Sequence, residues 1–318
     1  MTEFILGIDI GGTAIKIGII NIDGSIHSKW DIPTNIENQG ESIATDAWSS
    51  IVEKLDALHI EKDQLQGIGI GAPGFIDEKT GLVYKAVNIG WENFDLAHQF
   101  SELANLPVFV ANDANVAALG ENWVGAGNQA DHLIAVTLGT GVGGGIIANG
   151  AMISGENGTA GEIGHITIDP NGYKCNCGKR GCLETITSAT GMVRQAIALI
   201  EKNPESTLAE HHHKHGEITT KDIFDLAKQG DQLSEQIIDH TANVLGFAIS
   251  NIATVINPSK ILIGGGVSQA GESFIRKIET QFKRYALPRV SDICEFKIAE
   301  LGNDAGMIGA AYLVKERL

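Results

Sequence analysis

Two stretches of the chain share one alternation of apolar runs and glycine turns. In the first, apolar runs at 5–10 and 15–20 flank Gly11-Gly12-Thr13. In the second, apolar runs at 133–138 and 143–147 flank Gly139-Thr140-Gly141. Each second run ends in an Asn/Gly turn, which is typical of β-hairpins. The repeat therefore predicts two similar hairpins that open two similar halves of the protein.

Outside these hairpins the apolar pattern predicts strands that alternate with helices. We expect strands at 67–72, 108–111 and 260–263, and helices at about 40–58, 112–123, 192–201, 233–255 and 305–315. This alternation is typical of an α/β protein. The segment from Glu205 to Glu217 is polar and carries four histidines, so we expect a solvated loop there.

Composition narrows the classes of partner. The 318 residues include 39 acidic and 23 basic side chains, which gives a net charge of -16, and no run is rich in Lys or Arg. Nucleic acids and anionic membranes are therefore poor partners. The N-terminus does not have the pattern of a signal peptide, and no apolar run is long enough to cross a bilayer. We expect a cytoplasmic protein.

The segment from Glu162 to Glu184 concentrates metal-binding side chains. His165, Cys175, Cys177 and Cys182 follow the spacing H-x9-C-x-C-x4-C. One His with three Cys is a closed tetrahedral zinc set, so we predict a structural Zn²⁺. The alternatives are apolar packing or a disulfide, and Cys175 and Cys177 lie too close for an easy mutual bridge. Cys294 stands apart and is expected to be a buried, inert thiol.

The carboxylates that flank this zinc segment are candidates for sugar binding. Glu162 and Glu184 are acceptors of the kind that sugar hydroxyls need. The alternative is two solvated surface acids, but both residues belong to one loop that the metal would hold in place. We therefore favour the polyol-binding role.

The two glycine turns are candidates for phosphate binding, because such turns leave backbone N–H groups free to face a ligand. Asp9 at the end of the first strand is suited to hydrated Mg²⁺, although Asp also caps ordinary turns. Lys16 is either a phosphate cation or part of the solvent face. The second turn contains G-x-G-x-x-G, but a strand follows it instead of a helix, which excludes a dinucleotide fingerprint.

Two further turns end predicted strands. Asn112-Asp113 lies between a strand and a helix, where a carboxylate can face a ligand at the carboxyl end of the strand. Its structural alternative is a helix N-cap, and the two roles can fall to different atoms of the pair. Gly71-Ala72-Pro73-Gly74 is a rigid turn whose amides can contact a ligand hydroxyl or simply turn the chain.

Taken together, these motifs resemble the ROK family of sugar kinases and repressors, and within it the glucokinase branch. The resemblance rests on D-I-G-G-T from Asp9, G-A-P-G from Gly71, N-D-A-N from Asn112, L-G-T-G-V-G-G-G from Leu138, E-x-G-H from Glu162 and C-x-C-G-x-x-G-C-x-E from Cys175. It implies the actin-like, ribonuclease-H-like ATPase fold, with two similar domains around a cleft. The implied domains are residues 1–112 with the helix 305–318, and residues 113–304 with the zinc loop.

The resemblance also implies roles for single residues in ATP-dependent phosphorylation of glucose at its 6-hydroxyl. Asp113 would be the general base, and the sugar would bind to Gly74, Asn112, Asp113, Glu162, His165 and Glu184. The nucleotide would bind to Asp9, Gly11, Gly12, Thr13, Lys16, Thr137, Gly139, Thr140, Gly141, Gly265 and Gly266. The implied cofactors are ATP, Mg²⁺ and structural Zn²⁺, and the implied assembly is a homodimer.

Other members of the same family are the competing readings. A sugar-responsive repressor would carry a helix-turn-helix module ahead of Asp9, for which we expect no room. N-acetylmannosamine kinase and fructokinase share the ligand set and differ in pocket shape. Asn88-Ile89-Gly90-Trp91 resembles the N-x-x-W segment of glucokinases, and this similarity favours glucose.

Overall fold

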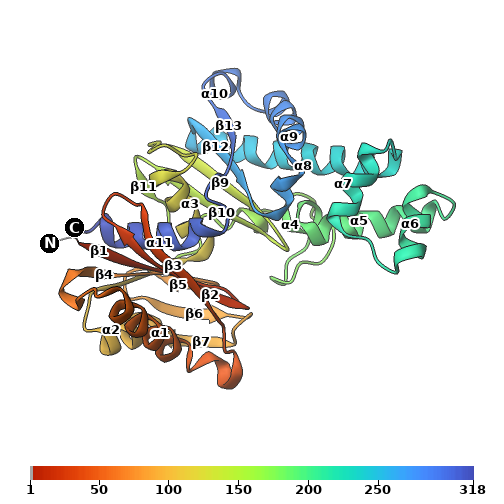
Figure 1. Ribbon diagram of the computed structural model, residues 1–318. Coiled ribbons are helices and arrows are strands. Elements are labelled where there is room, and N and C mark those ends of the chain that lie inside the picture. The colour runs from red at the N-terminus through yellow and green to blue at the C-terminus, as the bar shows by residue number, and fades with distance from the viewer. Residues whose placement is uncertain (1–2) are drawn as a thin grey trace. The chain divides into compact units, whose positions relative to one another are not determined.

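A computed structural model describes residues 3–318 of the chain (Figure 1). The chain forms two compact units. The first contains the residues up to Gln129 together with Gly145–Gly161 and Glu300–Leu318, and the second contains Ala130–Gly144 and Glu162–Ala299. The domain boundaries expected from the sequence stay a prediction.

The first unit is built on a five-stranded sheet in the order β3-β2-β1-β4-β8. Its strands are β1 (Phe4–Ile10), β2 (Ala14–Asn21), β3 (Ile26–Pro33), β4 (Leu65–Ala72) and β8 (Val108–Asn112). β1 and β2 form the first predicted hairpin, with Ile10 opposite Ile15. β4 runs parallel to β1, and β8 parallel to β4. The inner strands are apolar at almost every position because helices cover both faces of this sheet.

Helices pack on the two faces of the first sheet, as Figure 1 shows. These are α1 (Ile43–Leu58) and α2 (Leu96–Ala104) on one face, and α11 (Ala305–Lys315) with α3 (Asp113–Val124) on the other. Leu6 and Ile8 face α1, whereas Ile5 faces α11, as the two-residue period of a strand requires. A Cβ atom at Gly69 would overlap the carbonyl oxygen of Ala310, so glycine allows α11 to lie directly on β4.

A small antiparallel sheet also belongs to the first unit and was not predicted. It contains β5 (Phe75–Asp77), β6 (Leu82–Ala86) and β7 (Trp91–Asp95). Trp91 is buried and its ring stacks on Phe94 with the centroids 4.5 Å apart. The Trp of the N-x-x-W segment is therefore a core residue, and Asn88 lies beside Gly12 of the first turn.

The second five-stranded sheet has the order β11-β10-β9-β12-β13. Its strands are β9 (Leu133–Leu138), β10 (Val142–Ala148), β11 (Ala151–Met152), β12 (Lys260–Gly264) and β13 (Glu295–Ile298). β12 runs parallel to β9, and β13 parallel to β12, which repeats the arrangement of β1, β4 and β8. The second hairpin is thus confirmed, and it opens a sheet of the same topology as the first.

The second unit contains seven helices, four of which begin at a side-chain N-cap. They are α4 (Glu184–Thr187), α5 (Ala189–Lys202), α6 (Thr207–His215), α7 (Thr220–Lys228), α8 (Gln232–Ile256), α9 (Glu272–Tyr285) and α10 (Pro288–Ser291). The side chains of Ser188, Ser206, Thr219 and Asp231 each accept a hydrogen bond from a backbone N–H of the first turn. Single 3₁₀ turns complete the chain: η1 (Glu37–Gly40), η2 (Lys62–Gln64), η3 (Ile163–His165), η4 (Gly266–Ala270) and η5 (Gly302–Asp304).

Helix α6 corrects the loop predicted for the histidine-rich segment. Ser206 caps its start, Gly216 ends it in the left-handed conformation, and Leu208 and Ala209 are buried. Two buried apolar residues between good caps are enough to hold an otherwise polar helix against the unit. Among residues 3–318, no helix is both long enough and apolar enough to cross a membrane.

Candidate functional site

The predicted site residues divide between the two units. The first unit holds Asp9, Gly11, Gly12, Thr13, Lys16, Gly74, Asn112 and Asp113, and the second holds Thr137, Gly139, Thr140, Gly141, Glu162, His165, Glu184, Gly265, Gly266 and the three clustered cysteines.

Asp9 is the penultimate residue of β1 and carries a largely buried carboxylate. The absence of side chains at Gly71 and Gly306 makes room for it, since a Cβ atom at Gly306 would lie 2.7 Å from its Oδ2. Burial raises the pKa of Asp9, and the neighbouring Lys16 ammonium, 3.7 Å from Oδ2, partly lowers that pKa. A buried carboxylate with one partly exposed cation fits a further cation such as Mg²⁺, whose preferred ligands are oxygens.

The first glycine turn is held from behind by a residue far along the chain. The Gly11 N–H donates to Ala14 O at 3.0 Å and closes the turn. Thr34, just after β3, donates twice: Oγ1 to Gly11 O at 2.7 Å, and N–H to Thr13 O at 3.0 Å. Gly12 and Thr13 are exposed. The carbonyl groups of this turn therefore face the unit, and its outer edge faces solvent.

The second turn is held in a similar way by the start of α5. Gly139 N–H donates to Gly141 O at 3.0 Å, and Ala189 N–H donates to Gly139 O at 2.8 Å. Thr190 Oγ1 donates to Thr140 O at 2.9 Å. A Cβ atom at Gly139 would meet nothing within 4 Å, so this turn also presents an open face.

Two more predicted nucleotide residues lie at the end of β12 in the same unit. Gly264 pairs with Thr137, and Gly265, at φ +82°, packs against the backbone of Leu138 immediately before the turn. Gly266 begins η4, and a Cβ atom there would again meet nothing within 4 Å. The glycines at the end of β12 therefore lie next to the second glycine turn.

Asn112 and Gly74 are brought together in the first unit. Asn112 Oδ1 accepts from the Ala114 N–H at 2.9 Å as the N-cap of α3, and its Nδ2 donates to Gly74 O at 3.1 Å. Gly74 has φ +100°, a conformation that favours glycine. Asp113 is the first residue of α3, and its Oδ1 accepts from the Ala114 N–H at 2.8 Å. The cap alternative thus holds for Asn112, and it leaves Asp113 at the exposed helix start.

The zinc-type cluster converges in the second unit. The ligand atoms of His165, Cys175, Cys177 and Cys182 all lie within 4.8 Å of one another. His165 Nδ1 is 3.7 Å from Cys175 Sγ, and Cys177 Sγ is 3.6 Å from Cys182 Sγ. Tetrahedral zinc, with Zn–S near 2.3 Å and Zn–N near 2.0 Å, places neighbouring ligand atoms about 3.5–3.8 Å apart. These separations fit zinc, and the sulfur atoms are too far apart for a disulfide.

The two flanking carboxylates lie beside this cluster. Glu162 Oε2 is 4.0 Å from His165 Nε2, the ring nitrogen that points away from Cys175. Burial raises the pKa of Glu162, the His165 ring lowers it, and the Glu184 carboxylate raises it. Glu184 Oε1 is 3.6 Å from Cys175 Sγ, while its Oε2 accepts from the Val142 N–H at 3.1 Å. Glu184 therefore connects the cysteine cluster to the second glycine turn.

Nearly the whole chain matches a known protein family. The family model described as "ROK family" matches residues 5–317. The chain belongs to the ROK family. It is 52% identical to a glucokinase of Halalkalibacterium halodurans over 98% of this chain and 95% of the relative, and 32% identical to an N-acetylmannosamine kinase of Escherichia coli O157:H7 over 98% of both. A solved ROK glucokinase of Streptomyces griseus, in complex with glucose and AMPPNP, has a TM-score of 0.79 and 33% identity over 99% of this chain and 100% of that one.

Membership of the ROK family confirms the fold class expected from the motifs. The chain has the actin-like, ribonuclease-H-like ATPase fold, and the repeated order of strands in its two sheets agrees with that fold.

Sequence reasoning missed the side chains that hold this ROK site from behind. Thr34 and Thr190 lie 23 and 50 residues from the carbonyl groups that they bind. Glu78 makes a similar long-range contact with the N-D-A-N segment, since it accepts from Asn115 Nδ2 at 3.5 Å and also from Ser154 Oγ. No local sequence pattern predicts such contacts. The one available signal is that Thr190 follows the N-cap Ser188 by two residues and so lies in the first turn of a predictable helix.

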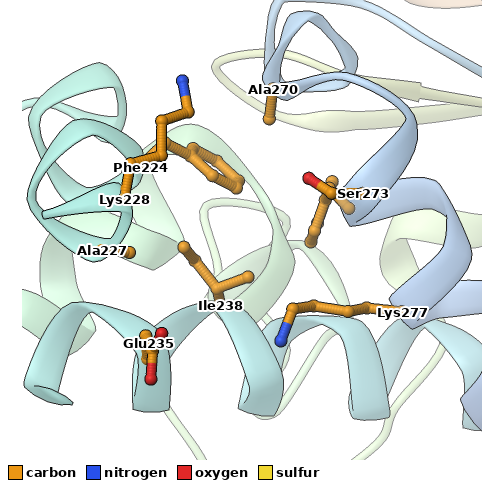
Figure 2. A pocket seen from close by; sticks show the side chains of 9 residues that line it. Phe224, Ala227, Lys228, Glu235, Ile238, Ala270, Ser273 and Lys277 are labelled. Atoms are coloured by element: carbon orange, nitrogen blue, oxygen red, sulfur yellow. The ribbon is translucent and has the colours of Figure 1, made fainter. Parts of the chain in front are cut away.

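A pocket of about 190 Å³ lies among α7, α8 and α9 of the second unit (Figure 2). Phe224, Ile238 and Ala270 give it an apolar lining, and Lys228 and Lys277 also line it. Both lysines already bind aspartates, Lys228 to Asp225 and Lys277 to Asp239. No lining residue belongs to the predicted ROK site.

Proposed function

We propose that this ROK protein is a glucokinase that transfers the γ-phosphoryl group of ATP to the 6-hydroxyl of glucose. The observation that carries the proposal is 52% identity over nearly the full chain to a glucokinase. It is supported by the similarity to a ROK glucokinase structure in complex with glucose and AMPPNP. The motifs from Asp9, Asn112 and Leu138 fall on turns and a helix start that are suited to phosphates and to sugar hydroxyls.

The glycine turns are the proposed phosphate sites. In phosphoryl transfer the protein mainly positions the reactants and balances the charge that develops on the phosphoryl oxygens. Backbone N–H groups at Gly12, Thr13, Thr140 and Gly141 can balance this charge, because the positive end of each N–H dipole attracts a phosphate oxygen. A protein with net charge -16 therefore needs no basic patch to bind a nucleotide. Mg²⁺, which Asp9 would help to hold, supplies further neutralisation of the phosphate charge when bound.

Asp113 is the proposed general base. Asn112 fixes the start of α3 through its cap and its bond to Gly74, so the carboxylate of Asp113 starts from a defined backbone position. We propose that this carboxylate accepts the proton of the sugar 6-hydroxyl as the oxygen attacks phosphorus. A positioned base contributes about 10²–10⁴-fold to the rate.

Glu162, His165 and Glu184 are the proposed partners of the other sugar hydroxyls, together with Asn112 and the backbone of Gly74. Zn²⁺ would be held by His165, Cys175, Cys177 and Cys182 and supplies a structural tie for this loop when bound. Nδ1 of His165 lies on the cysteine side, which leaves Nε2 and Glu162 toward the proposed sugar. Clustered thiols of this kind require a reducing compartment, so we propose a cytoplasmic enzyme.

The test is a coupled ADP-release assay with glucose, mannose, fructose, N-acetylmannosamine and N-acetylglucosamine. We expect the highest kcat/KM with glucose, and ³¹P NMR of the product should show a 6-phosphate. A higher kcat/KM with N-acetylmannosamine or fructose would instead identify another hexose kinase of the ROK family. Sugar binding without ADP release would identify a sugar-sensing regulator.

The catalytic role of Asp113 needs a separate variant. Asp113→Asn should lower kcat by about 10²–10⁴-fold. Titration calorimetry should still detect glucose and ADP binding within about threefold of the wild type, since the amide keeps the size of the side chain and the cap of α3 is untouched. An unchanged kcat would remove Asp113 from the base role.

We also propose a homodimer. Light scattering of the purified protein should then give a mass near twice 33.7 kDa. A mass near 33.7 kDa at all concentrations used in the assay would contradict the dimer.

A further inference from the structure

One threonine hydroxyl binds a carbonyl group in each glycine turn. Thr34 Oγ1 donates to Gly11 O at 2.7 Å, and Thr190 Oγ1 donates to Thr140 O at 2.9 Å. The two threonines come from unrelated local structures, since Thr34 follows a strand and Thr190 lies in the first turn of α5. The same type of contact therefore recurs at both turns of the duplicated hairpin.

The planarity of the peptide bond gives these contacts a consequence for the outer edge of each turn. In a trans peptide the C=O of one residue and the N–H of the next point in opposite directions. Because Thr34 holds Gly11 O, the Gly12 N–H is directed away from Thr34, and because Thr190 holds Thr140 O, the Gly141 N–H is directed away from Thr190. Each hydroxyl thus fixes the direction of one amide that faces the open side.

Glycine makes such a contact necessary. The turns contain glycines that have no side chain to restrict φ and ψ, so their peptide planes can rotate more freely than those of other residues. An amide that points in several directions loses part of its attraction for a phosphate oxygen, because binding must first order it. A fixed carbonyl removes this cost before the ligand arrives.

We propose that Thr34 and Thr190 are positioning residues that aim the amides of Gly12 and Gly141 at the phosphates of the nucleotide. The inference rests on the proposed use of ATP and adds two residues that touch neither the phosphates nor the sugar. In the second turn the hydroxyl acts beside the Ala189 N–H, which holds Gly139 O and so directs the Thr140 N–H.

The variants Thr34→Val and Thr190→Val remove the hydroxyl and keep the branched shape. Thr34→Ser and Thr190→Ser keep the hydroxyl and serve as conservative variants. Thr254→Val is the matched control, because Thr254 Oγ1 also donates to a backbone carbonyl, Ser250 O at 2.9 Å, but within α8. Titration calorimetry with ADP and with adenosine measures the phosphate contribution without any need for turnover, and steady-state assays then give KM for ATP and for glucose.

Each valine variant should weaken ADP binding by about three- to tenfold, the loss expected for one hydrogen bond. Adenosine binding and the KM for glucose should change by less than twofold, the KM for ATP should rise, and the serine variants and Thr254→Val should match the wild type. ADP affinity within 1.5-fold of the wild type in both valine variants would overturn the inference. So would an equal loss of adenosine affinity, or an equal loss in the serine variants.

Failure of the proposed function gives a different result. If wild-type protein binds ADP but phosphorylates a sugar other than glucose, the substrate proposal fails while the comparison of ADP with adenosine still decides the role of the threonines. If wild-type protein binds neither ADP nor ATP, both proposals are overturned together.

Discussion

Substitution of one cysteine of the zinc-type cluster tests how metal, sugar loop and phosphate turn depend on one another. Cys177→Ser is the informative change, because Cys177 is exposed and its loss removes little buried surface, whereas Cys175 and Cys182 are buried. Cys294→Ser is the matched control, since Cys294 is a buried cysteine outside the cluster.

The expected magnitude follows from the number of ligands. Structural zinc sites provide an apparent binding free energy of about 10–16 kcal/mol. Shared equally among four ligands, this is about 2.5–4 kcal/mol for each, or roughly 10²–10³-fold in zinc affinity. Cys177→Ser should therefore bind zinc more weakly by that factor, and Cys294→Ser should bind it as the wild type does.

The loss should reach the substrates through Glu184. This side chain lies 3.6 Å from Cys175 Sγ, accepts from the Val142 N–H, and packs against Gly141. Residues that support a metal ligand shell typically change affinity or activity by about 10–100-fold when disturbed. We expect KM for glucose to rise within that range when zinc is removed, together with a smaller rise in KM for ATP.

The assay is competition of the protein with a chelator of known zinc affinity, followed by a zinc-sensitive dye, and by kinetics on the same samples. Metal content should be one zinc per chain in the wild type and in Cys294→Ser. The reasoning fails if Cys177→Ser retains zinc within threefold of the wild-type affinity, or if fully metal-free wild type keeps its KM for glucose.

Three further predictions concern stability and reactivity. Glu121→Ala should lower the free energy of unfolding by about 3–5 kcal/mol in urea titrations. The buried carboxylate of Glu121 accepts hydrogen bonds from the backbone N–H groups of Ala126, Glu300 and Leu301, and all three would be left unpaired. A loss below about 1 kcal/mol would contradict this. Burial raises the pKa of the Cys294 thiol to about 12, and the nearby carboxylates contribute further. Cys294 should therefore resist iodoacetamide at pH 8 in the native protein and react in guanidinium. Mass spectrometry of the digested protein can measure this difference. Asp9→Asn should raise the melting temperature of the ligand-free protein at pH 7. Burial raises the pKa of Asp9, so the folded state loses stability as pH rises through the unfolded-state pKa and then the folded-state pKa. The gain from the substitution should vanish below the unfolded-state pKa near 3.8, where Asp9 is neutral in both states, and an equal gain at every pH would refute this cause.

The elements that sequence reasoning identified are those in which periodicity and caps agree. The two hairpins, α5, α8 and α11 were expected close to their observed bounds, since long apolar patterns fix both the type and the place of an element. The small sheet β5 to β7 was missed because its strands are only three to five residues long, which is too short for an alternating pattern to stand out. The α6 helix was missed because its composition is polar and only its caps mark it as helical.

In the candidate site, contacts within one short segment could likewise be predicted, whereas contacts between segments far apart in the sequence could not. The zinc-type cluster could be predicted because its spacing brings all four ligands into one short loop, and the observed separations fit the metal. The contacts of Thr34 with Gly11 and of Glu184 with Gly141 could not, because each joins segments more than twenty residues apart that only the folded sheet brings together. Ligands that lie together in one loop can thus be predicted from a sequence, whereas the distant side chains that support them cannot.

The two hairpins differ in the side chains at equivalent positions. Asp9 and Thr137 occupy equivalent positions, two residues before the turn and opposite a glycine of the parallel neighbour strand, Gly71 or Gly264. The first hairpin places a carboxylate there and Lys16 on its second strand, whereas the second has Thr137 and, at the position equivalent to Lys16, Gly144. Charge suited to a metal ion and phosphate is therefore confined to one hairpin. The second hairpin has no charged side chain at either position, and the carboxylate beside its turn, that of Glu184, comes from another segment and accepts from the Val142 N–H.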